Sequence, residues 1–132
     1  MAEQDLQLAQ EGYDAWNRGD LDWLLEHVTE DIEVKPNKAI NRFEDVYRGR
    51  EGWIAFWEKW HQVWEGAKVK VHRFEDMGDH GVLVLLSFDR PSDNGDPESV
   101  PVNHWITFRE GKFATFTAMS PETAERRREA RR

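Results

Sequence analysis

The sequence contains no cysteine among its 132 residues, which excludes disulfide bonds, thiolate nucleophiles and cysteine-ligated zinc. No apolar run approaches the roughly 18 residues of a membrane-spanning helix, and the mean hydropathy is −0.83. The first residues include Glu3 and Asp5, where a signal peptide would carry a basic and then an apolar stretch. These absences favour a protein of the reducing cytoplasm and predict no membrane partner.

Positive charge is also scarce. The chain has 26 Asp and Glu against 18 Lys and Arg, a net charge of −8, and the body before residue 122 carries −10. An acidic body repels phosphate backbones, so we expect no nucleic-acid partner. Ser120 and Pro121 form a helix start, with serine as N-cap and proline at the first helical position. We therefore interpret residues 121–132 as a charged, solvated terminal helix.

Hydropathy patterns predict helices in the first half of the chain and strands in the second. Apolar residues at helical spacing predict helices over residues 6–16, 21–28 and 50–65, the last with a stripe of tryptophans. Residues 32–36 fit a short strand, and residues 69–119 fit a four-stranded antiparallel meander. Helices followed by strands indicate an α+β protein, in which the helices cover a curved sheet.

Three stretches carry a resemblance to a known family: Tyr13–Asp20, Tyr47–Gly52 and Trp105–Lys112. They resemble the SnoaL-like branch of the nuclear transport factor 2-like superfamily, over a core of about residues 6–119. The resemblance implies one cone-shaped α+β domain with a curved, mixed sheet closed by three N-terminal helices. It also implies a pocket and a homodimer through the outer sheet face. Relatives include polyketide cyclases, steroid isomerases, epoxide hydrolases and dehydratases, so the fold alone does not choose an activity.

One histidine stands on an otherwise apolar strand face. His104 alternates with Val100, Val102, Ile106 and Phe108, and all five side chains share one side of the predicted strand. An imidazole in such a row is desolvated and can act as a general acid or base near neutral pH. The alternative is a structural histidine bonded to a neighbour. The resemblance places His104 where steroid isomerases carry a pocket aspartic acid, which favours a functional role.

Partners for His104 depend on the strand registers. A three-residue turn between the last two strands would set Phe116 opposite His104. The same register would place Ser120 opposite Val100, although Ser120 is equally explained as a helix cap. A symmetric loop before Val100 would bring Asp89 onto the face of His104, roughly 13 Å along the strand. A slip of one residue would turn Asp89 to the other face, so a His104–Asp89 dyad remains one hypothesis.

Aromatic residues supply candidate walls for a pocket. We expect Tyr13 and Trp16 from the first helix, Trp57 from the third helix and Phe116 to contact a ligand, while most other tryptophans fill the core. Trp105 points to the opposite side of the sheet from His104. An aromatic side chain on that outer face is a candidate dimer contact.

The catalytic residues of the named relatives are only partly present. Steroid isomerases carry an acid on the first strand, near Lys35 and Pro36, and neither residue is acidic. Epoxide hydrolases of this fold use an arginine and two aspartates. Asp89 matches one aspartate, but Ser87 stands at the arginine position and Ala118 at the second aspartate. Both specific activities are therefore disfavoured.

The sequence thus predicts a pocket for a small hydrophobic, cyclic metabolite. If the protein is an enzyme, His104 transfers a proton in an isomerisation, cyclisation or dehydration, and the last would need a second pocket histidine, for which His72 is the candidate. The alternative is a non-catalytic binding or dimeric scaffold protein. The five histidines lack the close spacing of metal ligands, so we expect neither a metal nor a cofactor.

Overall fold

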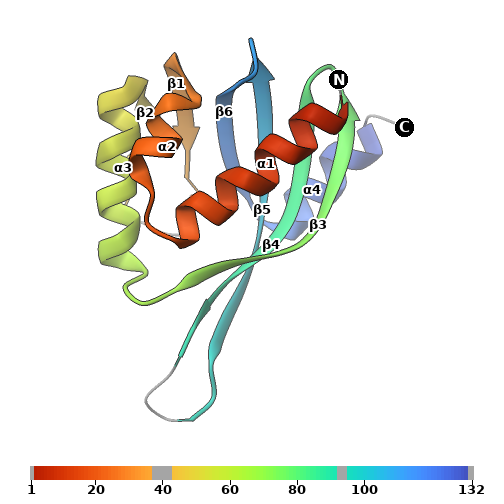
Figure 1. Ribbon diagram of the computed structural model, residues 1–132. Coiled ribbons are helices and arrows are strands. Elements are labelled where there is room, and N and C mark those ends of the chain that lie inside the picture. The colour runs from red at the N-terminus through yellow and green to blue at the C-terminus, as the bar shows by residue number, and fades with distance from the viewer. Residues whose placement is uncertain (1, 37–42, 92–94, 131–132) are drawn as a thin grey trace.

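The computed structural model describes residues 2–36, 43–91 and 95–130. In chain order the elements are α1 (Ala2–Asn17), α2 (Leu21–Glu26), β1 (Val28–Lys35), β2 (Tyr47–Arg48), α3 (Gly49–Val63), β3 (Lys68–Gly78), β4 (Gly81–Arg90), β5 (Glu98–Arg109), β6 (Lys112–Met119) and α4 (Pro121–Ala130). The strands form one curved sheet in the order β2-β1-β6-β5-β4-β3 (Figure 1). The predicted α+β class with a mixed sheet is confirmed, and the sheet does not close on itself.

The first long strand is longer than the sequence pattern indicates. Val28, expected at the end of the second helix, instead begins β1 and pairs with Phe113 of the parallel strand β6. The main-chain N–H of Phe113 donates to the carbonyl oxygen of His27 at 2.8 Å. Val28 therefore belongs to the strand because it pairs with β6. The local spacing of apolar residues does not predict this pairing.

The break between α1 and α2 follows the sequence. Gly19 adopts a φ of +76°, and the carboxylate of Asp20 accepts the N–H of Trp23 at 3.0 Å. Asn17 ties this corner to the sheet, because its side-chain amide donates to the carbonyl of Val69 at 2.7 Å and accepts the Val69 N–H at 2.8 Å. One side chain thus satisfies two main-chain groups of the edge strand β3 and fixes where α1 ends.

The turn between β5 and β6 is shorter than expected. Arg109 pairs with Lys112, so only Glu110 and Gly111 form the turn, both with positive φ. A bulge beside Phe108 shifts the register once more before the strands continue. Together these features move β6 by two residues relative to the predicted pairing.

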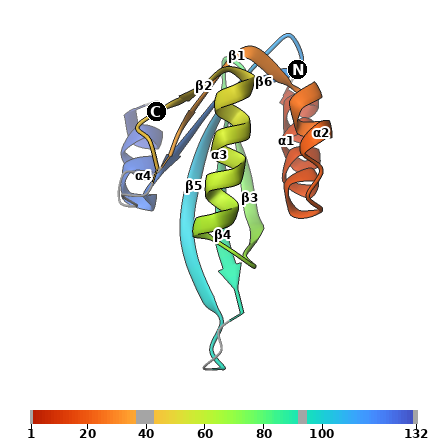
Figure 2. The same ribbon diagram turned by 90° about the vertical axis from the view of Figure 1, so that its left-hand side faces the viewer.

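The two faces of the sheet are covered differently. Figure 2 shows α1 and α2 on one side and α4 on the other. The main core lies on the side of α1 and α3, and a smaller cluster of Leu83, Met119 and Ala124 lies under α4. Trp105 packs against this smaller cluster, and the guanidinium of Arg127 lies 5.6 Å from its ring centre. Helix α4 therefore packs on the sheet, and it covers Trp105, which the sequence pattern indicated as a contact of the homodimer.

None of the helices in the described ranges is long and apolar enough to cross a membrane.

A close approach between α1 and β6 sets the depth of the main core. A Cβ atom on Gly12 would lie 2.7 Å from Cζ of Phe113, a ring that is itself 1% exposed. Helix α1 can therefore lie this close to the sheet only where residue 12 has no side chain.

We predict that Gly12→Ala destabilises the protein although alanine favours helices. Overpacking costs about 1–3 kcal/mol, whereas the gain in helix propensity is about 1 kcal/mol. Urea unfolding of a double-mutant cycle with Phe113→Leu measures this, because the smaller leucine makes room for the new methyl group. The steric account predicts that Gly12→Ala becomes neutral or stabilising in the Phe113→Leu background. Equal destabilisation in both backgrounds would contradict it.

Candidate functional site

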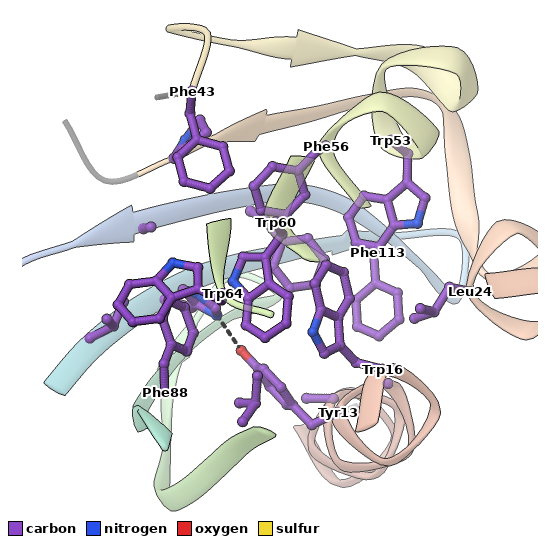
Figure 3. Close-up of a pocket in the computed structure, with 18 residues that line it drawn as sticks. Tyr13, Trp16, Leu24, Phe43, Trp53, Phe56, Trp60, Trp64, Phe88 and Phe113 are labelled. Atoms are coloured by element: carbon purple, nitrogen blue, oxygen red, sulfur yellow. Dashed lines mark hydrogen bonds between the residues drawn. The ribbon is translucent and has the colours of Figure 1, made fainter. Parts of the chain in front are cut away.

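A small cavity lies between α1, α3 and the inner face of the sheet (Figure 3). Its free volume is about 60 Å³, and its walls are almost wholly apolar and largely aromatic. Space of this size holds about two water molecules at ~30 Å³ each, and it is well below the ~150 Å³ of an engineered cavity that binds benzene. Helix α1 contributes Tyr13 and Trp16, α3 contributes Trp53 and Trp60, and β5 contributes His104.

His104 is the ionisable group of β5 that faces this cavity. It lies opposite Val84 of β4 and Ala118 of β6, and the rings of Phe88 and Phe116 have their centres 6.2 Å and 6.1 Å from the imidazole. Burial lowers the pKa of His104 from its ordinary value of 6.5 to about 4, because the charged form loses its hydration. The imidazole is therefore neutral at physiological pH.

The polar partner of His104 is Tyr13. The phenolic Oη of Tyr13 lies 2.7 Å from Nδ1 of His104, drawn as the dashed line in Figure 3. The two rings are nearly parallel, with 14° between their planes and 5.9 Å between their centres. Burial raises the pKa of Tyr13 well above its ordinary value of 10.0, so the phenol keeps its proton. Two neutral groups, 91 residues apart in sequence, form one hydrogen-bonded pair inside an apolar cavity.

Sequence reasoning placed Tyr13 on the pocket wall but missed its bond to His104. The helical period does turn Tyr13 to the same side of α1 as Ala9 and Trp16. How far along the sheet that side chain reaches depends on where α1 crosses β5. The sequence pattern alone carries no signal for that crossing.

Asp89 lies on the opposite face of the sheet from His104. In the observed register Asp89 pairs with Ser99 rather than Val100, the one-residue slip that turns its side chain outward. The hydroxyls of Ser99 and Ser87 each donate to Asp89 Oδ1 at 2.7 Å, and these bonds hold the pKa of Asp89 below its ordinary value. Asp89 therefore cannot pair with His104, and the dyad is corrected to Tyr13–His104.

His72 belongs to the same outward cluster. Its Nε2 lies 3.0 Å from Oγ of Ser87, and the imidazole is exposed. It is therefore not a second histidine of the cavity.

The remaining expected site residues divide into two groups. Trp16 and Phe116 line the cavity, and Phe116 stays on the face of His104 because the register of β6 shifted by an even number of residues. Ser120 does not line it, since its Oγ accepts the N–H of Thr123 at 3.2 Å and caps α4. Trp57 is also absent from the wall. It packs with ring centres 4.7 Å from Trp16 and 4.3 Å from His61.

The orientation of α3 explains the position of Trp57. The inward side of this helix runs along Trp53 and Trp60, which are 2% and 3% exposed. At 100° per residue, Trp57 lies about 60° around the helix axis from Trp60. It therefore flanks the cavity behind Trp16 instead of facing His104.

Three indole nitrogens in the cavity wall lack partners. Nε1 of Trp16, Trp53 and Trp64 is buried and has no hydrogen-bond acceptor among the described residues. The described lining residues include no carboxylate, and no cluster of three metal-binding side chains occurs in the described ranges. The site can therefore offer hydrogen bonds and aromatic surface, but it has no fixed charge.

Comparison with family models settles the classification. A model described as the SnoaL-like domain matches residues 9–116. The chain belongs to the SnoaL-like family. The match covers both members of the Tyr13–His104 pair and every strand from β1 to β5. A sequence comparison with curated proteins finds no match.

Solved structures share the SnoaL-like fold at low sequence identity. Bal32a, from a soil-derived mobile gene cassette, is 21% identical with a TM-score of 0.77, covering 89% of this chain and 88% of its own. TerC, crystallised with polyporic acid, is 17% identical with a TM-score of 0.76, covering 94% and 96%. A protein of Jannaschia sp. CCS1, provisionally named a SnoaL-like polyketide cyclase, is 16% identical with a TM-score of 0.74, covering 94% and 90%.

We predict that His104 makes this SnoaL-like protein less stable in mild acid. Its folded pKa of about 4 lies below the ordinary 6.5, so the unfolded chain takes up the proton first as the pH falls. The free energy of unfolding therefore keeps its full value above pH 6.5 and falls as the pH drops towards 4, by about 3 kcal/mol in all. Urea unfolding across this range measures it.

His104→Gln is the decisive variant, because glutamine keeps an acceptor for the Tyr13 hydroxyl but does not titrate. We expect a flatter dependence of the unfolding free energy on pH between 6.5 and 4 in this variant. A slope that persists in His104→Gln would contradict the assignment. Asp20, Asp31 and Asp89 have lowered pKa values, so their protonation changes the free energy of unfolding only below pH 4.

Proposed function

We propose that this protein binds a small hydrophobic, cyclic molecule in the cavity and that His104, bonded to Tyr13, carries any chemistry done there. The observation behind the proposal is the Tyr13–His104 pair, two convergent polar groups in an otherwise apolar, aromatic cavity. Ligand sites usually combine apolar walls with a few placed polar groups in this way. The reactions that fit are isomerisation, cyclisation and dehydration without a cofactor.

The structural neighbours support this class of ligand. TerC was crystallised with polyporic acid, and the Jannaschia protein carries a provisional name as a polyketide cyclase. At 17% and 16% identity, these structures show that the fold is shared, and no more than the fold. A related activity in this chain therefore rests on its own residues, of which His104 and Tyr13 are the ones suited to proton chemistry.

Binding requires the aromatic wall to move. The free volume of about 60 Å³ is too small for a ring compound. Trp64 and Phe43 are wall residues that are only partly buried. The guanidinium of Arg90 lies 5.6 Å from the Trp64 ring and is itself paired with Glu98. We propose that a ligand enters by displacing Trp64, the wall residue that packs against this exposed ion pair.

A second candidate is binding without catalysis. The described wall has no carboxylate to accept a substrate proton, and aromatic rings make up most of the wall. A protein of this design could bind or carry a ligand without changing it. Epoxide hydrolysis has no support in the cavity, because Ser87 and Asp89 lie on the outer face and only Ala118 is in the wall.

We predict that the bicyclic ketone 1-tetralone binds in the cavity and quenches tryptophan fluorescence. Ala118→Phe should abolish this binding, because the new ring occupies the free space beside His104. Ala55→Phe, on the exposed side of α3, is the matched control and should bind as the native chain does. Equal quenching by all three proteins would place the ligand elsewhere and overturn the proposed site.

Deuterium exchange at the α-carbon of bound 1-tetralone separates the two candidate functions. In a catalytic site a water molecule takes the proton from the α-carbon while His104 hydrogen-bonds to the carbonyl oxygen, and a deuteron from D₂O then returns to the carbon, which proton NMR follows directly. We expect exchange faster than in buffer and about a hundredfold slower in His104→Gln, the lower end of the contribution of one acid–base group. Binding with no acceleration would support the non-catalytic candidate.

A homodimer through the outer sheet face also stays a proposal. Helix α4 covers Trp105, so a partner would contact the part of the face beyond it, where Pro101 is exposed and Thr115 and Thr117 lie on β6. Light scattering should then give twice the chain mass of 15.6 kDa. Thr117→Arg should lower that mass, whereas Ala55→Arg should not. A native mass of 15.6 kDa would refute the dimer. A cytoplasmic location stays a prediction, testable by cell fractionation.

A further inference from the structure

We propose that Tyr13 fixes His104 in the tautomer protonated at Nε2, so that the side-chain polar atoms of the cavity that lack a protein partner are hydrogen-bond donors and favour ring compounds with a carbonyl-type acceptor oxygen. This inference rests on the proposed function. It assigns His104 the role of a donor to a ligand oxygen rather than that of a base. Tyr13 is then a positioning residue that acts through His104.

The hydrogen bond between Tyr13 and His104 has a definite direction. A neutral imidazole has one N–H and one acceptor nitrogen. A phenol is a much stronger acid than an imidazole N–H, and the imidazole nitrogen is a better acceptor than the phenol oxygen. The separation of 2.7 Å is that of a hydrogen bond, and the difference in acidity between the two groups sets its direction. The Tyr13 hydroxyl therefore donates to Nδ1, and the ring hydrogen of His104 lies on Nε2.

The Nε2–H group of His104 has no acceptor within the described protein. Among the described residues none accepts a hydrogen bond from this nitrogen. His104 lines the cavity, so a bound molecule can supply the missing acceptor. His104 is partly buried, so a ligand oxygen would replace water as the partner of this N–H. A ligand oxygen beside Nε2 would accept a hydrogen bond from an imidazole that carries no charge.

Three tryptophans of the cavity wall carry further unpartnered donors. The indole N–H groups of Trp16, Trp53 and Trp64 are donors only, and all three are buried without an acceptor among the described residues. They belong to the same wall as His104, which contains no carboxylate in its described part. The side-chain polar atoms that lack a partner in the described part of this wall are therefore donors. A carbonyl oxygen can accept from such a donor, a hydrocarbon cannot, and an ammonium group brings further donors instead of an acceptor.

The tautomer can be tested on the free protein. Nitrogen-15 NMR of the histidine rings should show Nδ1 of His104 unprotonated and Nε2 protonated at neutral pH. Tyr13→Phe removes the donor to Nδ1 and should shift the ring towards a mixture of tautomers. Tyr47→Phe is the matched control, since Tyr47 Oη accepts the N–H of Glu44 and does not line the cavity. A native His104 protonated at Nδ1 would overturn the inference.

The preference for a ligand with an acceptor oxygen can be tested with a matched pair of probes. 1-Tetralone and 1,2,3,4-tetrahydronaphthalene have the same ring skeleton, and only the ketone has an acceptor. We expect the native protein to bind the ketone about tenfold more tightly, the value of one hydrogen bond. Tyr13→Phe should reduce this ratio, and Tyr47→Phe should keep it.

The outcomes separate this inference from the proposed function. Equal affinity for the two probes would overturn the inference while leaving the cavity as a binding site. Tighter binding of 1-aminotetralin, which is an ammonium at neutral pH, would also overturn it. Failure of every probe to bind would overturn the proposed function, and the NMR experiment would still decide the tautomer.

Discussion

Burial of aromatic rings between the helices and the inner face of the sheet is the constraint on which this molecule depends. Helix α1 can approach β6 closely because Gly12 leaves room for Phe113. That approach carries Tyr13 to His104 and Trp16 to the stripe of α3. The same desolvation keeps both members of the pair neutral, lowering the pKa of His104 and raising that of Tyr13. Packing and the chemical state of the site therefore have one cause.

The two faces of the sheet separate two kinds of chemistry. The inner face holds neutral polar groups in an almost wholly apolar lining, where a hydrogen-bond partner within the protein or on a ligand offsets their burial. The outer face holds the Asp89 cluster with exposed groups around it, and helix α4 packs farther along, where Arg128 pairs with Glu75. Charge is thus confined to the side where solvent can screen it. The cavity owes its neutral character to this division.

A neutral donor in an apolar cavity suits a particular kind of chemistry. It polarises an oxygen without a charge that would need hydration, and it avoids the cost of forming a buried ion. It does not by itself remove a proton from carbon. A reaction at His104 would therefore rely on an already acidic substrate or a water molecule. Binding without catalysis needs neither an acidic substrate nor a water molecule. The small free volume means that either function requires side-chain movement in the wall.

The sequence by itself determined the class of fold, the inward face of β5 with His104, the break at Gly19 and the cap of α4 at Ser120. These follow from local periods, turn residues and capping preferences, which act over a few neighbouring positions. The strand registers were decided only by tertiary structure. A turn one residue shorter and a bulge moved β6, and a one-residue difference in β4 sent Asp89 outward. The Tyr13–His104 bond joins elements 91 residues apart. No local pattern encodes it, because it exists only where helix and strand cross.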